Sequence, residues 1–163
     1  MNWVKSRILP AFQSSPMHQV IKTVLVEHTA QQMYDLVEQI EQYHEFLPWC
    51  GGTEVRQREG LQTVATLHID YHGLKHHFTT RNQNTPGEKI DMLLVDGPFR
   101  HLEGVWRFIP LADYACKVEF RLEYEFASSM LEKAVGPVFS KIANTFVDAF
   151  VKRAERIYRQ TTS

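Results

Sequence analysis

The stretch from Cys116 to Phe126 (CKVEFRLEYEF) alternates without interruption between apolar and charged side chains. Successive side chains of a β-strand point to opposite faces of a sheet, so the pattern predicts a strand with one buried face and one solvent-exposed face. A strand covered by helices on both sides would not carry charge at every second position. The chain therefore needs an antiparallel sheet that buries one face, and something apolar must cover that face.

The rest of the chain supplies both parts. Residues rich in β-branched and aromatic types predict further strands at 19–26, 53–59, 61–71, 74–82, 89–95 and 101–109. Apolar residues at helical spacing predict a short helix at 30–40, with Thr29 as its N-cap, and a long amphipathic helix at 128–158. We expect Gly136–Pro137 to kink this long helix. The order of elements indicates an α+β fold whose curved antiparallel sheet wraps around the long C-terminal helix.

Composition limits the compartment and the partners. The formal net charge of the 163 residues is −1, so no global charge attracts the chain to DNA or to an anionic membrane. Cys50 and Cys116 are too few for a disulfide framework and fit a reducing compartment. No apolar run is long enough to span a bilayer as a transmembrane segment. We expect one domain over residues 18–160, in the cytoplasm or peripheral to the inner membrane, after a loosely ordered N-terminal extension at 1–17.

Residues 43–52 (YHEFLPWCGG) form an unusually apolar segment between the short helix and the next strand. A proline and a pair of glycines within it argue against a regular helix or strand. Loops normally run over the surface and are polar. Two interpretations stay open: the segment covers the mouth of a cavity through Phe46, Leu47 and Trp49, or it plugs one end of a solid core.

Several separate segments, in this order, resemble one protein family. They are YHEFLPWC at 43–50, FTTRN at 78–82, LVDGPFRHLEGVWRFIP at 94–110 and VFSKIANTFVDAFVKRAERIY at 138–158. The family is the coenzyme Q-binding, START-like group of the SRPBCC superfamily, whose bacterial members include ribosome association toxins. The resemblance covers about residues 20–158. It implies the helix-grip fold, which agrees with the layout predicted above.

The resemblance also implies two functions, and the sequence does not choose between them. Some relatives bind ubiquinone in an apolar cavity and support respiration without known catalysis. Others are toxins that bind the large ribosomal subunit and block subunit joining. Our first hypothesis is a non-enzymatic protein that binds ubiquinone, or a similar isoprenoid lipid, in support of respiratory electron transport. The ribosome-directed toxin is the alternative.

A bound quinone would need a long apolar slot with aromatic walls and one or two hydrogen-bond donors. Trp106 lies in a family motif and offers both an aromatic wall and an N–H donor. For the other candidates on the strands and the long helix, a place in the solid core is the better single explanation, whereas for Phe99 and for the apolar segment both explanations stay open. The candidate ligand-binding residues are Phe46, Leu47, Trp49, Phe99, Leu102, Trp106, Phe108, Phe120, Phe139 and Phe146.

Metal and catalytic sites find less support in the sequence. The histidines between residues 68 and 101 fall on strands and turns, and no cysteine accompanies them at ligand spacing, so we predict solvated histidines and no metal. Glu119, Glu123 and Glu125 occupy the charged face of their strand. Because no nucleophile motif is present either, we predict no catalysis.

Basic side chains gather in the last turns of the long helix, at Lys152, Arg153, Arg156 and Arg159. Positive charge there also suits the helix dipole, so local stabilisation is a sufficient explanation. Acids interleave with most cations on the strands, which weakens a nucleic-acid patch on the sheet. The ribosome hypothesis therefore rests mainly on the resemblance.

Overall fold

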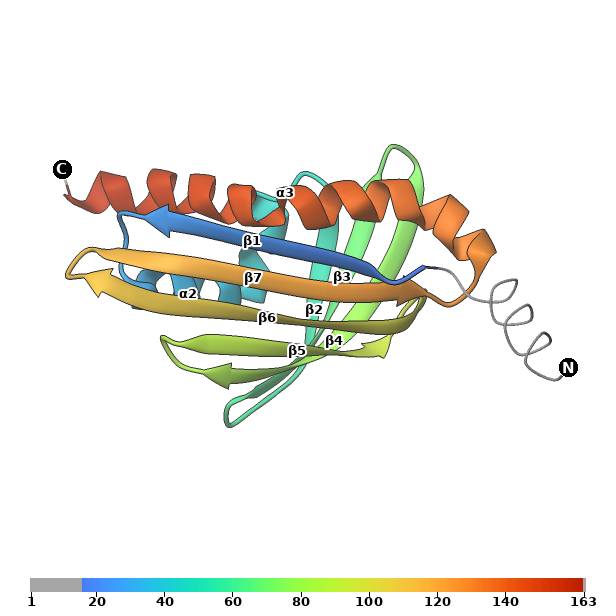
Figure 1. The fold of residues 1–163 in the computed structure, drawn as a ribbon, viewed down its shortest axis with the longest axis horizontal. Helices are drawn as coiled ribbons and strands as arrows, with labels where there is room; N and C mark the ends of the chain where they lie inside the picture. Colours follow the sequence, from blue (N-terminus) through green and yellow to red (C-terminus); the bar gives the residue numbers. More distant parts are fainter. Residues whose placement is uncertain (1–15, 163) are drawn as a thin grey trace, which may run out of the picture.

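The computed structural model describes residues 16–162, and residues 1–15 of the predicted N-terminal extension lie outside this range. The described chain forms one antiparallel sheet with the strand order β1-β7-β6-β5-β4-β3-β2 (Figure 1). The strands are β1 (His18–Val26), β2 (Cys50–Glu59), β3 (Gln62–Tyr71), β4 (Leu74–Thr85), β5 (Lys89–Asp96), β6 (Phe99–Ala112) and β7 (Ala115–Phe126). The helices are α2 (Ala30–Glu38), the 3₁₀ helix η1 (Ile40–Glu45) and α3 (Ser129–Thr162).

The long helix α3 runs along β1 and covers the inner face of the curved sheet, with α2 and η1 beside it (Figure 1). The alternation predicted for β7 is confirmed, because every second side chain from Cys116 to Phe126 is buried beneath these helices. β7 pairs with β1 through Val24–Val118 and with β6 through Trp106–Phe120. The α+β helix-grip architecture expected from the sequence is therefore confirmed.

The N-cap predicted for α2 is confirmed, and α3 starts with a serine cap that was not predicted. The Thr29 hydroxyl accepts a hydrogen bond from the Gln32 N–H (3.0 Å), and the Gln32 side chain accepts one from the Thr29 N–H (2.9 Å). The Ser128 hydroxyl accepts one from the Leu131 N–H at the start of α3 (3.1 Å). Pro137 lies inside α3, whose first turns bend away from the rest of the helix in Figure 1, as expected for a proline. In the described chain, no helix combines the length and the hydropathy needed to cross a bilayer.

The apolar segment 43–52 is less irregular than predicted. Its first residues belong to η1, and β2 begins at Cys50, so the expectation that Gly51 and Gly52 lie outside a strand is wrong. β2 pairs with β3 from Cys50 onward, and the Asp70 N–H donates to the Trp49 carbonyl oxygen just before it (2.8 Å). A β-bulge between Cys50 and Gly52 shifts the register of this pairing. Glycine is required at position 51 for close packing, because a Cβ on residue 51 would lie only 2.9 Å from the Cβ of Asp70.

Candidate functional site

A cavity of about 60 Å³ lies between the inner face of the sheet, η1 and the middle of α3. Seven of its sixteen lining residues are aromatic, and η1, α3 and each strand from β3 to β7 contribute at least one side chain. The lining residues are Ile40, Tyr43, Trp49, Leu67, Phe78, Thr80, Asn82, Met92, Leu102, Trp106, Phe120, Leu122, Phe139, Ile142, Ala143 and Phe146.

The space exists because small side chains interrupt the large ones. Along the inner face of β4, the large Phe78 is followed by the smaller Thr80 and Asn82. On α3, Ala143 stands between two aromatic residues of the lining. On β6, Gly104 leaves room that the ends of neighbouring side chains fill, since a Cβ there would lie 2.8 Å from the Met92 methyl carbon.

The polar groups of the cavity wall are few. The Thr80 hydroxyl donates to the Asn82 side-chain oxygen (2.9 Å), and both residues are buried. The Trp106 side chain is 1% exposed, and its indole Nε1 has no hydrogen-bond partner. The Tyr43 hydroxyl donates to the Val37 carbonyl oxygen, and burial raises the pKa of this phenol. The lining residues include no carboxylate, imidazole or amine.

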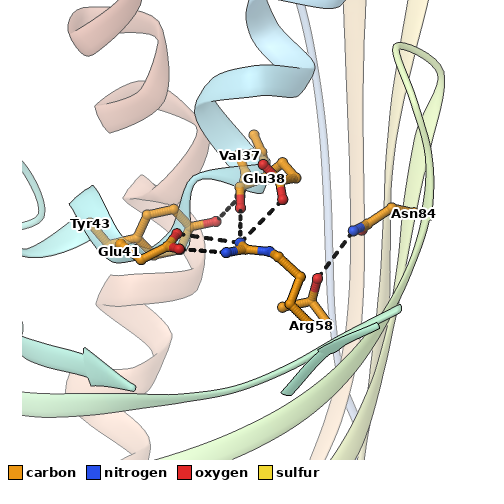
Figure 2. A network of polar contacts seen from close by, with 7 residues as sticks. Val37, Glu38, Glu41, Tyr43, Arg58 and Asn84 are labelled. Carbon is orange, nitrogen blue, oxygen red and sulfur yellow. Dashed lines mark hydrogen bonds and ion pairs between the residues drawn. The ribbon is translucent and has the colours of Figure 1, made fainter. Parts of the chain in front are cut away.

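An arginine on β2 holds η1, which roofs the cavity, against the sheet. Figure 2 shows Arg58 reaching Glu38 and Glu41, with an Nη2–Oε1 distance of 3.1 Å to Glu38. The hydrogen bond from Arg58 lowers the pKa of Glu41, whereas burial raises the pKa of Glu38. Tyr43, at the left of the same view, ties η1 back to α2 through the Val37 carbonyl. The roof is therefore fixed by one cation shared between two acids and by one buried hydroxyl.

A surface groove of about 650 Å³ lies on the other side of the apolar segment, between that segment and the C-terminal half of α3. Trp49 lines both the groove and the cavity and so forms part of the wall between them. Arg153 spans the groove: its Nη2 is 2.7 Å from Glu45 Oε1, and its guanidinium lies over the Phe46 ring at 5.0 Å. The lining is completed by His44, Leu47, Pro48, Thr145, Asp148, Ala149, Lys152 and Arg156.

The structure brings together part of the predicted ligand-binding set. Phe46 and Leu47 face the groove rather than the cavity, so of the three residues expected to cover the cavity only Trp49 reaches it. Their place in the ligand-binding set remains a prediction. The predicted residues that line the cavity are Trp49, Leu102, Trp106, Phe120, Phe139 and Phe146.

Two further predicted residues point inward but pack outside the cavity lining. Phe99 follows the Gly97–Pro98 turn and stacks on Phe126, with ring centroids 5.0 Å apart. Phe108 packs edge-on against Tyr34 of α2, at 6.0 Å between centroids. The expected inward orientation of β6 is confirmed, but position along the curved sheet decides which of its residues reach the cavity.

The polar pair Thr80–Asn82 was missed as a candidate. The signal was present in FTTRN, where the large Phe78 is followed, at every second position on the buried face of the strand, by the smaller Thr80 and Asn82. Tyr43 was also missed, because the sequence suggested a loop where the structure has a 3₁₀ turn that turns this ring inward.

One group in the described chain has the spacing of a cation site. Potential ligand atoms of His101, Glu103 and Glu123 lie within 4.8 Å of one another on the outer face of β6 and β7, and Glu103 is exposed to solvent. Exposed acids of this kind are common without an ion. His68 illustrates the solvated histidines expected from the sequence, since it is exposed on the sheet and its Nε2 lies 2.6 Å from Glu54 Oε2.

Comparison with known proteins places the chain in a family. Residues 26–151 match the family model described as polyketide cyclase/dehydrase and lipid transport. The chain belongs to this family. The START-like, SRPBCC relationship inferred from the sequence motifs is thereby confirmed.

Relatives and structural neighbours of the chain have names that describe different functions. The ribosome association toxin RatA of Vibrio cholerae is 46% identical over 142 residues, which cover 87% of this chain and 99% of that protein. The mitochondrial coenzyme Q-binding protein COQ10 homolog B of Xenopus laevis is 30% identical, over 78% of this chain and 54% of that protein. The crystal structure of the Zhui aromatase/cyclase from a Streptomyces species superposes with a TM-score of 0.72 at 21% identity, over 86% of this chain and 95% of that one. This last likeness shows the fold alone.

Proposed function

We propose that the chain acts on ribosomes, as a toxin that binds the large subunit and blocks its joining to the small subunit. The observation that carries the proposal is the 46% identity to a ribosome association toxin across 99% of that protein's length. The coenzyme Q-binding relative matches at 30% and over 54% of its length. The similarity therefore reverses the order of the two hypotheses drawn from the sequence.

The chemistry of the interior supports a role in binding without catalysis. General acid–base catalysis needs a titratable side chain within hydrogen-bond reach of the substrate. The titratable group of the cavity lining is Tyr43, whose hydroxyl is already donated to a backbone carbonyl and whose pKa is raised by burial. We therefore place the activity on the outer surface of the molecule, at a contact with a macromolecule.

A subunit-joining assay tests this proposal. Purified large and small ribosomal subunits are mixed under conditions that favour joining, the protein is added in increasing amounts, and the mixture is separated on a sucrose gradient. We expect joined ribosomes to decrease, free subunits to increase and the protein to migrate with the large subunit. The Trp106→Phe variant should act like the wild type, because it alters only the interior. An unchanged profile at excess folded protein would refute the proposal.

A second candidate function, binding of an apolar ligand such as ubiquinone, is favoured by one specific observation. The Trp106 indole N–H is buried in the cavity wall without a hydrogen-bond partner. An unsatisfied buried donor costs about 1–3 kcal/mol, and a ligand carbonyl would remove this cost. The amide of Asn82 and the hydroxyl of Thr80 are further polar groups of the lining.

The size of the cavity sets a condition on this second function. Pockets for drug-sized ligands measure roughly 300–1,000 Å³, whereas this cavity measures about 60 Å³. A quinone ring can therefore enter only if wall residues move. Phe146 is the wall aromatic with the greatest freedom to do so, because it is only partly buried on α3.

Titration with a short-chain ubiquinone, followed by tryptophan fluorescence, tests the second function. We expect saturable quenching and, for Trp106→Phe, an affinity about fivefold weaker, which is the value of one lost hydrogen bond of about 1 kcal/mol. Leu102→Met, a volume-conserving change in the same wall, serves as the control. If a normally folded Trp106→Phe variant bound the quinone as tightly as the wild type, Trp106 would not be the hydrogen-bond donor. If the wild type showed no saturable quenching, the proposed quinone binding would be wrong.

A further inference from the structure

The groove beside the apolar segment differs in charge from the other large hollow of the surface. Three cationic side chains of the groove, Lys152, Arg153 and Arg156, face two acidic ones, Glu45 and Asp148. A hollow of about 470 Å³ on the outer face of the sheet has the opposite balance. Its two arginines are Arg81 and Arg121, and its three acids are Asp91, Glu103 and Glu123. In a protein of net charge −1, the groove is thus a local concentration of positive charge.

Two of the three groove cations are available to a partner. Lys152 and Arg156 are exposed, and within the described part of the chain neither makes a hydrogen bond or an ion pair. Arg153 is different, because Glu45 and the Phe46 ring hold its guanidinium and the side chain is only 11% exposed. Its Nε is nevertheless buried without a hydrogen-bond partner. One arginine therefore shapes the groove, and two cations stand free beside it.

The floor of the groove is apolar and partly aromatic. Phe46, Pro48 and Ala149 contribute its accessible part, whereas Trp49 is 4% exposed and the Arg153 guanidinium lies over one face of the Phe46 ring. A cationic groove with aromatic side chains is the arrangement that binds single-stranded nucleic acid, in which phosphates meet Lys and Arg while unstacked bases lie against rings. A fully charged lining would bind phosphate without offering a place for a base.

We propose that this groove binds looped or single-stranded RNA of the large ribosomal subunit, with phosphates at Lys152 and Arg156 and a base or ribose against the apolar floor. The identity of the RNA rests on the proposed ribosomal function, whereas the location of the contact rests on the charge and shape of the groove. It assigns the contact to the α3 side of the molecule, away from the outer face of the sheet.

An anionic membrane surface is the less suitable partner. Membrane-surface binding combines basic residues with large apolar side chains that enter the lipid. At the groove, the exposed lining residues are His44, Glu45, Pro48, Thr145, Asp148, Lys152 and Arg156, with no large apolar side chain among them. The exposed large apolar residues of the described chain lie elsewhere, at Met17, Ile21, Leu25, Leu61, Leu93, Val95, Leu111, Tyr114 and Met130.

The test compares two charge-neutralised variants. Lys152→Gln/Arg156→Gln removes the free cations of the groove, and Arg81→Gln/Arg121→Gln removes two exposed arginines from the outer hollow. Binding to protein-free RNA extracted from large subunits is measured by filter retention over a range of salt concentrations, and binding to intact large subunits by co-sedimentation. Equal melting temperatures of the variants and the wild type establish that all three are folded.

We expect the groove variant to lose on the order of tenfold or more in RNA affinity at 100 mM salt and the outer-face variant to bind like the wild type. The slope of log affinity against log salt should become shallower by about 1.4 for two lost phosphate contacts on single strands. Equal losses in both variants, or none in the groove variant, would overturn the location.

Other outcomes distinguish a wrong identity of the partner from a wrong proposed function. Wild-type binding to intact subunits but not to their protein-free RNA would replace RNA by a ribosomal protein as the partner. Co-flotation with phosphatidylglycerol vesicles that is lost only in the groove variant, without RNA binding, would replace it by a membrane. RNA binding through the groove with no effect on subunit joining would leave the location standing and refute the proposed function.

Discussion

The inner face of the sheet has two aromatic ends, and only one of them leaves space. At what we call the solid end, Phe99, Tyr124 and Phe126 pack together, with ring centroids 5.0 Å apart for Phe99–Phe126. Phe139 lies between the two ends, because its ring is 4.8 Å from Phe99 and it also lines the cavity. At the cavity end, Trp106 lies equally close to its neighbour Phe120, at 4.6 Å. Aromatic content and ring spacing therefore do not distinguish a filled core from a cavity.

The difference comes from the small residues between the rings. The cavity end contains Thr80, Asn82 and Ala143, whereas Phe78, on the same strand as Thr80, stands at the border between the two ends, lining the cavity with its ring 6.0 Å from Phe99. A core is close-packed only when the side chains supply enough volume to fill it. A ligand space in such a fold is thus recognised by a decrease in side-chain size along one strand, and the following predictions test that explanation.

The largest effect is expected from Phe99→Ala at the solid end. The ring is 5% exposed and surrounded by other rings, so its removal leaves a cavity and should lower the free energy of unfolding by about 3–5 kcal/mol. Phe146→Ala at the cavity end should cost clearly less, because that ring is only partly buried and already borders empty space. Urea denaturation of both variants measures the difference. Equal losses would mean that the two ends are packed alike.

A smaller effect separates two alanines of α3. Ala143 lines the cavity and Ala154 does not, and both are buried. Substitution by valine carries the same helix-propensity cost at both positions, so any difference reports on packing. We expect Ala154→Val to lose about 1–3 kcal/mol through overpacking and Ala143→Val to lose about 0.5 kcal/mol or less. Thermal and urea unfolding give the comparison, and a larger loss for Ala143→Val would contradict a cavity at that position.

The smallest effect concerns the roof of the cavity end. Because Arg58 lowers the pKa of Glu41, this carboxylate stabilises the fold above its unfolded pKa, and the contribution is lost as pH falls through the folded value. Glu41→Gln should lower the free energy of unfolding at pH 7 by about 0.2–1 kcal/mol, as for a surface pair, and the difference should diminish as pH falls below the unfolded glutamate pKa of about 4.3.

Glu38 provides the matched control with the opposite sign. Burial raises its pKa, so its ionisation opposes folding as pH rises above its unfolded pKa. Glu38→Gln is therefore expected to be neutral or stabilising at pH 7. Urea denaturation at pH 7 and at pH 3.5 distinguishes the two variants. A pH-independent loss in Glu41→Gln would show that the Arg58 contact stabilises the roof by packing rather than by charge.

The sequence predicted the fold well because its strongest signals are local. The charges of β7 at every second position and the cap at Thr29 depend only on neighbouring residues, and both were read correctly. The candidate site was predicted in part because it depends on the pairing register. Phe99, Trp106 and Phe108 all point inward from β6, but their distance along a curved strand decides which reaches the cavity, and alternation carries no information about that distance.

In the apolar segment too, the sequence predicted the general position of the side chains but not which of them face the cavity. Its composition indicated a cover for the interior, and Trp49 lies in that position. The 3₁₀ turn of η1 rotates Tyr43 inward and leaves Phe46 on the groove side, which a sequence without helical or strand periodicity does not reveal. Size along β4 was the available clue to the cavity, because Thr80 and Asn82 alternate on the buried face of a strand already predicted.

Trp49 is a wall common to the interior and the surface. The cavity and the groove share this indole as a wall, so a molecule that displaces it from one side changes the shape of the other. Linkage between two such sites is reciprocal: the factor by which an interior ligand changes the affinity of the groove is the factor by which the groove's partner changes the affinity of the cavity. In this molecule, Trp49 is the residue through which such linkage would have to act.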